Sequence, residues 1–232
     1  RSLTTAGSAY LEKCRVILNM VDAAESSLAE EKAVPRGRIR LGLPLSYGLQ
    51  ALVPVLLDFA QDQPFIELIM DLSDQRANLI EEGLDLSIRI TADLQPGDIV
   101  RKLGECRLLT LASPGYIAQH GQPRRPEELR HHECLIYASD TAISHWTYLS
   151  KGQTLQVPVR GRIVANNGAA LTEAAARGMG ITRQPDFIAA PFLASGQVQA
   201  ILQKFENAPL GIYAVLPSNR YIPHRVSVLI EH

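Results

Sequence analysis

Residues 38–46, RIRLGLPLS, decide the fold of this chain. An apolar side chain stands at every second position of residues 38–43, and this period of two predicts a strand. The turn residues 44–46 follow, and apolar residues then recur at helical spacing over residues 49–60. A second alternating run over residues 65–72 predicts the next strand.

The alternation of strands and helices continues beyond this stretch. A short helix is expected over residues 75–82, followed by an apolar strand over residues 85–90. Successive strands joined by helices need crossover connections, which make neighbouring strands parallel and are almost always right-handed. Residues 38–90 therefore predict an α/β fold with a parallel sheet.

The helix after the first strand has two local signals. Ser46 is of a residue type that caps helix N-termini, so we expect it to cap this helix. Pro54 has no N–H group and predicts either a kink or a late start of the helix near Ala51.

A second αβ cluster spans residues 107–205. Its expected strands are residues 107–112, 134–137, 146–149, 153–159, 161–164, 180–183 and 198–202, and its expected helices are 114–120, 169–177 and 185–193. A strand over residues 210–216 and a helix from His224 end the chain. We expect one subdomain of residues 35–106 with 206–232 and a second of residues 107–205.

The N-terminal segment, residues 1–34, predicts a long helix. Its apolar positions are spaced by alternating steps of four and three: Tyr10, Cys14, Ile17, Val21, Ala24 and Leu28. This spacing is typical of a helix paired with another helix, in a partner chain or a neighbouring domain. The alternative is an amphipathic helix packed on its own domain. The sequence AVPRG at residues 33–37 then breaks the helix as a hinge would.

Composition excludes several classes of protein. The chain has 46% hydrophobic and 20% charged residues, which is ordinary globular usage and not that of a disordered or fibrous protein. Its net charge of −1 argues against this chain alone binding nucleic acid. No apolar run is long enough to span a membrane, and no signal sequence opens the chain, so we expect a cytoplasmic protein.

Three cysteines, Cys14, Cys106 and Cys134, are spaced too widely for a metal site and are an odd number for a disulfide framework. A redox-sensing Cys134 beside His131 and His132 is conceivable, because an imidazolium would lower the thiol pKa. We favour the alternative, a half-buried cysteine at the start of a strand.

Polar side chains follow the first three expected strands. Ser46 comes after the first strand, Ser73 and Asp74 after the second, and Arg89 and Thr91 close the third. Ligands of open α/β sheets bind outside the carboxyl ends of the strands. A helix N-terminus beside Ser46 can bind an anion, and Arg89 can hold a carboxylate through two hydrogen bonds.

Each of these residues also has a structural interpretation. Ser46 could be an N-cap only, and Arg89 could form an ion pair with Asp71, Asp74 or Asp85. Their joint position at strand ends favours a ligand site. In the second subdomain, Asn167 and Thr182 also lie at the ends of expected elements.

The order of motifs along the chain resembles the effector-binding domain of LysR-type transcriptional regulators. The resemblance is carried by SLTTAGSAYLEKC (2–14), PRGRIRLGLPLSYG (35–48), LSDQRANLIEEGLDLSIRI (72–90), LLTLASPGYIAQHGQPRRPEELRHHECLIY (108–137), RGRIVANNGAALTEAAARGMGI (160–181), PDF (185–187) and YAVLPSNRYIPHRVSVLIE (213–231).

This resemblance implies two Rossmann-like subdomains joined by a hinge, similar to type 2 periplasmic binding proteins and preceded by a linker helix. It implies a small-molecule effector bound between the subdomains. The implied lining residues are Ser46, Ser73, Asp74, Arg89 and Thr91 from the first subdomain, and Tyr137, Trp146, Asn166, Asn167 and Thr182 from the second.

The sequence departs from the family in two respects. The family's winged helix-turn-helix, which would precede Arg1, is missing from this sequence, so DNA would be bound only through that domain. Arg183 and Gln184 stand in a strand that is usually apolar, so they must find polar partners or line the site. Arg183 could be a ligand-selecting cation, or it could be turned to the surface.

We therefore expect an effector-sensing and oligomerisation module, without enzymatic activity, cofactor, metal or membrane partner, that binds a small carboxylate and forms a homodimer or homotetramer. A ligand that prefers one conformation would shift the protein toward that conformation. The alternative with the same fold is a solute-binding protein for transport. An enzyme is less well supported, because no nucleophile elbow or phosphate loop occurs.

Overall fold

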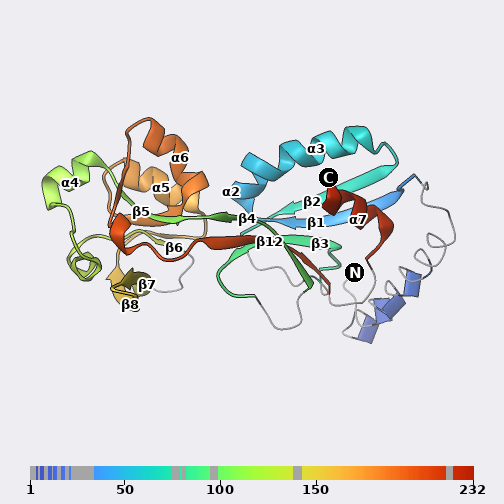
Figure 1. The fold of residues 1–232 in the computed structure, drawn as a ribbon, viewed down its shortest axis with the longest axis horizontal. Helices are drawn as coiled ribbons and strands as arrows, with labels where there is room; N and C mark the ends of the chain where they lie inside the picture. Colours follow the sequence, from blue (N-terminus) through green and yellow to red (C-terminus); the bar gives the residue numbers. More distant parts are fainter. Residues whose placement is uncertain are drawn as a thin grey trace. The chain divides into compact units, whose positions relative to one another are not determined.

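The computed structural model describes residues 34–74, 79, 82–94, 99–137, 143–217 and 222–232, with scattered positions from Thr4 to Val21. The chain forms two compact units (Figure 1), Arg1–Leu103 with Ile212–His232 and Gly104–Gly211. We expected the chain to pass from one subdomain to the other at residues 106–107 and 205–206. It passes between the two units at residues 103–104 and 211–212, a few residues away and inside strands. The predicted α/β class is confirmed.

Unit 1 is built on a five-stranded sheet in the order β2-β1-β3-β12-β4. These strands are β1 (Gly37–Leu43), β2 (Ile66–Leu72), β3 (Leu86–Thr91), β4 (Ile99–Cys106) and β12 (Leu210–Leu216). β1 pairs in parallel with both β2 and β3, as the crossover argument predicts. Ile39, Leu41 and Leu43 of β1 are buried in the core of the unit.

One helical segment follows β1 and corrects two expectations. It consists of α2 (Leu45–Tyr47), a π-helical stretch (Gly48–Leu52) and α3 (Val53–Asp62). Ser46 lies inside α2, so the prediction that it is the N-cap was wrong; Pro44 occupies the cap position. A kink at Pro54 or a late start near Ala51 was expected; the segment is instead helical from Leu45 onward, and α3 begins at Val53 with Pro54 in its first turn. The C-terminal helix α7 (His224–Glu231) also contacts β1.

Unit 2 has three layers around an antiparallel sheet of order β10-β5-β11. Its strands are β5 (Leu108–Ala112), β10 (Thr182–Pro185) and β11 (Gln199–Ile201). On one face, α5 (Gly168–Ala176) and α6 (Asp186–Ala194) pack against Leu109 and Leu111. Figure 1 shows both helices on the same side of β5.

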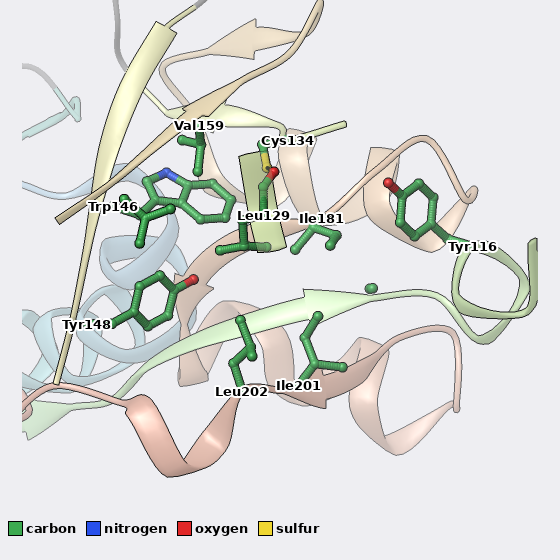
Figure 2. Close-up of a cluster of buried hydrophobic side chains, with 11 residues drawn as sticks. Tyr116, Leu129, Cys134, Trp146, Tyr148, Val159, Ile181, Ile201 and Leu202 are labelled. Atoms are coloured by element: carbon green, nitrogen blue, oxygen red, sulfur yellow. Dashed lines mark hydrogen bonds between the residues drawn. The ribbon is translucent and has the colours of Figure 1, made fainter. Parts of the chain in front are cut away.

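The other face of this sheet packs against the hairpin of β7 (Ile143–Ser150) and β8 (Gln153–Arg160). Trp146 and Tyr148 of β7 meet Ile201 and Leu202 in this cluster, as Figure 2 shows. The hairpin closes through Lys151 and Gly152, both at positive φ, with Ser150 opposite Gln153. Such a two-residue turn matches the twist of the paired strands.

Shorter elements complete unit 2. They are α4 (Pro114–His120), the 3₁₀ helices Pro126–His131 and Gln203–Phe205, and the parallel pair of β6 (Ile136–Tyr137) with β9 (Val164–Ala165). Strand β4 was not predicted. Ser113 caps α4 by accepting a hydrogen bond from the N–H of Tyr116.

Two expected helices fall largely outside the described residues. The short helix at residues 75–82 is one of them. The other is the linker helix of residues 1–34, of which Tyr10, Cys14, Ile17 and Val21 are described and are helical. Tyr10, Ile17 and Val21 are exposed. No described helix is long and apolar enough to cross a bilayer.

Candidate functional site

The five predicted residues of unit 1 lie at one edge of its sheet. Leu43 of β1 pairs with Leu72 of β2, so these two strands end level. Gly42 pairs with Ser87 of β3, which continues to Thr91, so Arg89 stands two residues beyond that pair. Ser46, Ser73, Asp74, Arg89 and Thr91 therefore follow or close these strands together. Ser73 is exposed and the other four are half-buried.

Asp74 is bound directly to the helix that follows β1. Its Oδ1 accepts the N–H of Leu45, the first residue of α2, at 2.9 Å. The N–H of Ser73 donates to the carbonyl of Leu43, also at 2.9 Å. The carboxylate of Asp74 thus occupies the position that an anionic ligand would take at this N–H group.

Thr91 is engaged in a local turn. Its hydroxyl donates to the carbonyl of Asp93 at 2.9 Å and accepts the N–H of Asp93 at 3.0 Å. Asp85, one alternative partner for Arg89, accepts the N–H of Arg40 at 2.8 Å. Arg89 supplies a positive charge among the described residues of this edge, two residues past the paired Ser87.

Three predicted residues of unit 2 also share an edge. Tyr137, which ends β6, pairs with Ala165, which ends β9, and Asn166 and Asn167 follow directly. Tyr137 is 41% exposed and Asn166 is exposed. Asn167 is the N-cap of α5, since its Oδ1 accepts the N–H of Ala170 at 3.1 Å.

Two other predicted residues of unit 2 are buried. Trp146 is 7% exposed and packs in the hydrophobic cluster with Tyr148 and Val157, so it offers almost no surface to a ligand (Figure 2). The large apolar ring is better satisfied by the core than by solvent. Thr182 is fully buried, and its Oγ1 accepts a hydrogen bond from Nε2 of Gln184 at 2.9 Å.

Arg183 lies on the opposite face of β10 and is half-buried. Its guanidinium carbon is 4.9 Å from the centre of the Tyr148 ring. The Tyr148 hydroxyl is 2.9 Å from Oγ1 of Thr110, and burial raises the pKa of Tyr148 to about 12. Burial lowers the pKa of Arg183, which Tyr148 and Glu206 partly offset, and its Nε has no hydrogen-bond partner among the described residues. The alternative of a surface-turned Arg183 is therefore wrong.

Gln184 was not among the predicted site residues, although its position in an apolar strand was noticeable. It is 2% exposed, and its Oε1 lies against Gly168 at the start of α5, so closely that a Cβ on Gly168 would overlap it. Gln184 therefore links Thr182 to the helix that Asn167 caps. The expectation that this glutamine finds a polar partner is confirmed.

The cysteines of unit 2 are protected. Cys134 is fully buried, and burial, with a smaller effect of Glu133, raises its pKa to about 12. Burial and Asp186 raise the pKa of Cys106 to about 11. A high thiol pKa disfavours the reactive thiolate, so the structural interpretation of Cys134 holds.

The described residues hold no group of three or more His, Cys, Asp or Glu side chains suited to a metal. Unit 2 has an open hollow of about 560 Å³, lined by residues that include Arg107, Val198 and Gln203. None of the predicted site residues lines this hollow.

Comparisons with known proteins agree on one family. Residues 32–232 match the LysR substrate binding domain. An uncharacterized HTH-type transcriptional regulator of Haemophilus influenzae is 30% identical over 97% of this chain and 78% of its own. An HTH-type transcriptional regulator of Xanthomonas campestris is 31% identical over 99% of this chain and 68% of its own.

Solved structures show the same likeness. The full-length Vibrio cholerae virulence activator AphB has a TM-score of 0.74 and 28% identity, over 99% of this chain and 78% of that chain. CrgA, a LysR-type transcriptional regulator from Neisseria meningitidis, has a TM-score of 0.74 and 27% identity over the same shares, 99% and 78%.

Proposed function

Because the chain belongs to the LysR substrate-binding domain family and is the effector-binding part of a LysR-type regulator, we propose that it senses a small anionic molecule with the polar edges of its two units. The observation that carries this proposal is the parallel register of β1, β2 and β3, in which Ser46 and Ser73 follow the level ends of β1 and β2 and Arg89 lies two residues beyond the pair of Gly42 with Ser87. The relatives are transcriptional regulators, so a transport function is not favoured.

The side chains at this edge support an anionic effector. Asp74 already satisfies the N–H of Leu45, so an anion at unit 1 would be bound by Arg89 and by the hydroxyls of Ser46 and Ser73. A carboxylate suits a guanidinium, since two parallel N–H groups match its two oxygens. Tyr137 and Asn166 of unit 2 would supply an aromatic surface and an amide.

The effector would act through its preference for one conformation. A ligand that binds one arrangement of the protein better than another shifts the population by the difference in affinity. That shift would be transmitted to a separate DNA-binding domain in the cytoplasm.

The test uses the purified chain and a panel of small carboxylates such as acetate and succinate. We expect at least one of them to raise the melting temperature, because a ligand that binds the folded state stabilises it. Arg89→Ala should weaken its binding by about tenfold or more, the cost of a lost hydrogen bond to a charge. Arg38→Ala is the matched control, since Arg38 pairs with Glu67 near the amino end of β1. An unchanged affinity in Arg89→Ala would refute the role of Arg89.

Assembly is the second part of the proposal. Several apolar side chains of the π-helical stretch, α3, β2 and the turn just before β2 are exposed: Leu49, Val55, Leu57, Phe65 and Ile69. Tyr10, Ile17 and Val21 of the N-terminal helix are exposed as well. We propose that such surfaces are covered in a homodimer or homotetramer. Native mass spectrometry of the purified chain would report the assembly and any bound small molecule, and a monomer at micromolar concentration would contradict it.

A further inference from the structure

Two histidines of unit 2, His120 and His132, contact Tyr116 of α4, and His131 is next to His132 in the chain. We name His120, His131, His132 and Tyr116 the histidine cluster. Nδ1 of His132 is 3.1 Å from the Tyr116 hydroxyl. The ring of His120 stacks on the ring of Tyr116, with centroids 4.4 Å apart. His131 accepts a hydrogen bond from Nε of Arg130 at 3.0 Å. No part of the proposed effector site lies in this cluster.

The hydrogen bonds fix where the protons lie. The hydroxyl oxygen of Tyr116 accepts the N–H of Glu133 at 3.1 Å, so its own proton is available to His132. A neutral imidazole with its proton on Nε2 accepts that proton at Nδ1. When His132 gains a second proton, Nδ1 becomes a donor to the Tyr116 oxygen, which already accepts the N–H of Glu133, and the hydroxyl proton of Tyr116 must turn away and lose its acceptor.

The groups facing His132 come from three segments. His120 of α4 and the adjacent His131 disfavour a positive charge on His132, and Glu128 of the 3₁₀ helix favours it. Glu133 and Cys134 face Tyr116 from the strand that follows. Burial is the largest influence, and it lowers the pKa of His132 below the ordinary value of about 6.5.

Glu133, the next residue, joins three segments of unit 2. Its N–H binds Tyr116 of α4, its carbonyl accepts the N–H of Ile181 at 2.9 Å, and its Oε1 accepts the N–H of Arg162 at 2.6 Å. Ile181 leads into β10, and Arg162 lies just before β9. The bond between His132 and Tyr116 therefore stands one residue from a junction that orders both strands.

We propose that His132 and Tyr116 form a pH-sensitive latch, which holds the Glu133 junction of unit 2 when His132 is neutral and loosens it when His132 is protonated. The folded state binds fewer protons at this site than the unfolded state, since the pKa of His132 is lowered on folding. The stabilisation is therefore present above the ordinary histidine pKa and is lost as pH falls through the interval below it.

The first measurement is an NMR titration of the histidines in the whole chain between about pH 5 and pH 8. We expect His132 to titrate below about 6.5, with its neutral form protonated on Nε2. For each pH unit by which the pKa of His132 in the folded chain lies below the ordinary value, the equilibrium constant for opening the latch should rise about tenfold as the pH falls through that interval. A His132 pKa at or above the ordinary value would overturn the proposal.

The second measurement is hydrogen exchange of the backbone amides, corrected for the intrinsic effect of pH. Protection of the Glu133 and Ile181 amides should fall at low pH, and protection of Leu111 in the central strand should stay. His132→Asn should abolish this pH dependence, because Asn Oδ1 can accept the Tyr116 proton and does not titrate. His131→Asn is the matched control and should keep it. Unchanged pH dependence in His132→Asn, or none in the unmodified chain, would refute the latch.

Discussion

The two units of this chain keep their polar side chains in different places. In the described part of unit 1, the core is apolar except for Ser87, and the candidate ligand-binding groups stand at the ends of strands. Unit 2 has polar side chains inside: Thr110, Ser113, Thr172, Thr182 and Gln184 are all buried. A buried polar group must be hydrogen-bonded, so the interior of unit 2 depends on specific hydrogen-bonded pairs of side chains. The interior of unit 1 depends on contacts between apolar side chains.

The largest expected effect on the free energy of unfolding comes from adding a methyl group in unit 2 where one backbone segment lies directly against another. A Cβ on Gly161 would overlap the carbonyl oxygen of Cys134. Backbone cannot move aside as a side chain can, so we expect Gly161→Ala to lower the free energy of unfolding by about 3 kcal/mol. Urea unfolding followed by the fluorescence of Trp146, the one tryptophan of the chain, measures it.

Gly42 provides the matched change in unit 1. A Cβ there would lie 2.8 Å from Cδ1 of Leu84, the end of a flexible side chain. Gly42→Ala should therefore cost about 1 kcal/mol, which circular dichroism of the whole chain can follow. Gly115→Ala, with nothing within 4 Å of the new Cβ, is the neutral control. Equal losses at Gly161 and Gly42 would contradict the contrast between the units.

Thiol reactivity tests the same contrast. Cys106 and Cys134 of unit 2 are buried with pKa values raised to about 11 and about 12, and Cys14 of unit 1 is half-buried. At pH 8 a thiol with a pKa near 11 is only about a thousandth thiolate. A disulfide reagent should therefore modify Cys14 of the native chain quickly. It should modify Cys106 and Cys134 at least about a hundredfold more slowly. Peptide mapping identifies them, and rapid labelling of Cys134 would show that unit 2 opens readily.

A smaller effect is expected from one hydroxyl group inside unit 2. Tyr148→Phe removes the partner of Thr110 Oγ1 and should cost about 1–2 kcal/mol, because a buried acceptor and donor lose their bond. Adding Thr110→Val should recover part of this loss, since no unpaired hydroxyl then remains. If the double variant is as unstable as the sum of the single ones, the hydroxyl pair does not act as a unit.

The sequence predicts strands best where one face is buried. The alternation in β1 and β2 and the boundaries of α4 and β12 could all be found, because their apolar residues follow a clear period. Strand β4 was missed because most of its residues are exposed and include Arg101 and Lys102, so no apolar face marks it. Local pattern carries no information about a strand that is held only by its neighbours.

The candidate site shows a similar limit. Residues near the ends of strands, such as Arg89 and Asn167, could be placed from the sequence, because the order of elements along the chain predicts where each strand ends. Trp146 could not be placed, because the sequence does not say whether an aromatic ring faces the core or an opening. Gln184 was conspicuous as a polar residue in an apolar strand, yet its contact with Gly168 depends on how α5 packs on β10.

The smallest expected effect is at the surface, where the difference between the units should vanish. Arg38 and Glu67 of unit 1 pair at 3.1 Å, and Arg177 and Glu173 of unit 2 pair at 2.7 Å, with all four side chains largely in solvent. Exposed pairs gain little, because water and salt screen them, so Arg38→Ala and Arg177→Ala should each cost at most about 0.5 kcal/mol. Urea unfolding with and without added salt measures both. A large, salt-sensitive loss in one unit only would mean that surface charge, and not the buried polar pairs, distinguishes unit 2 from unit 1.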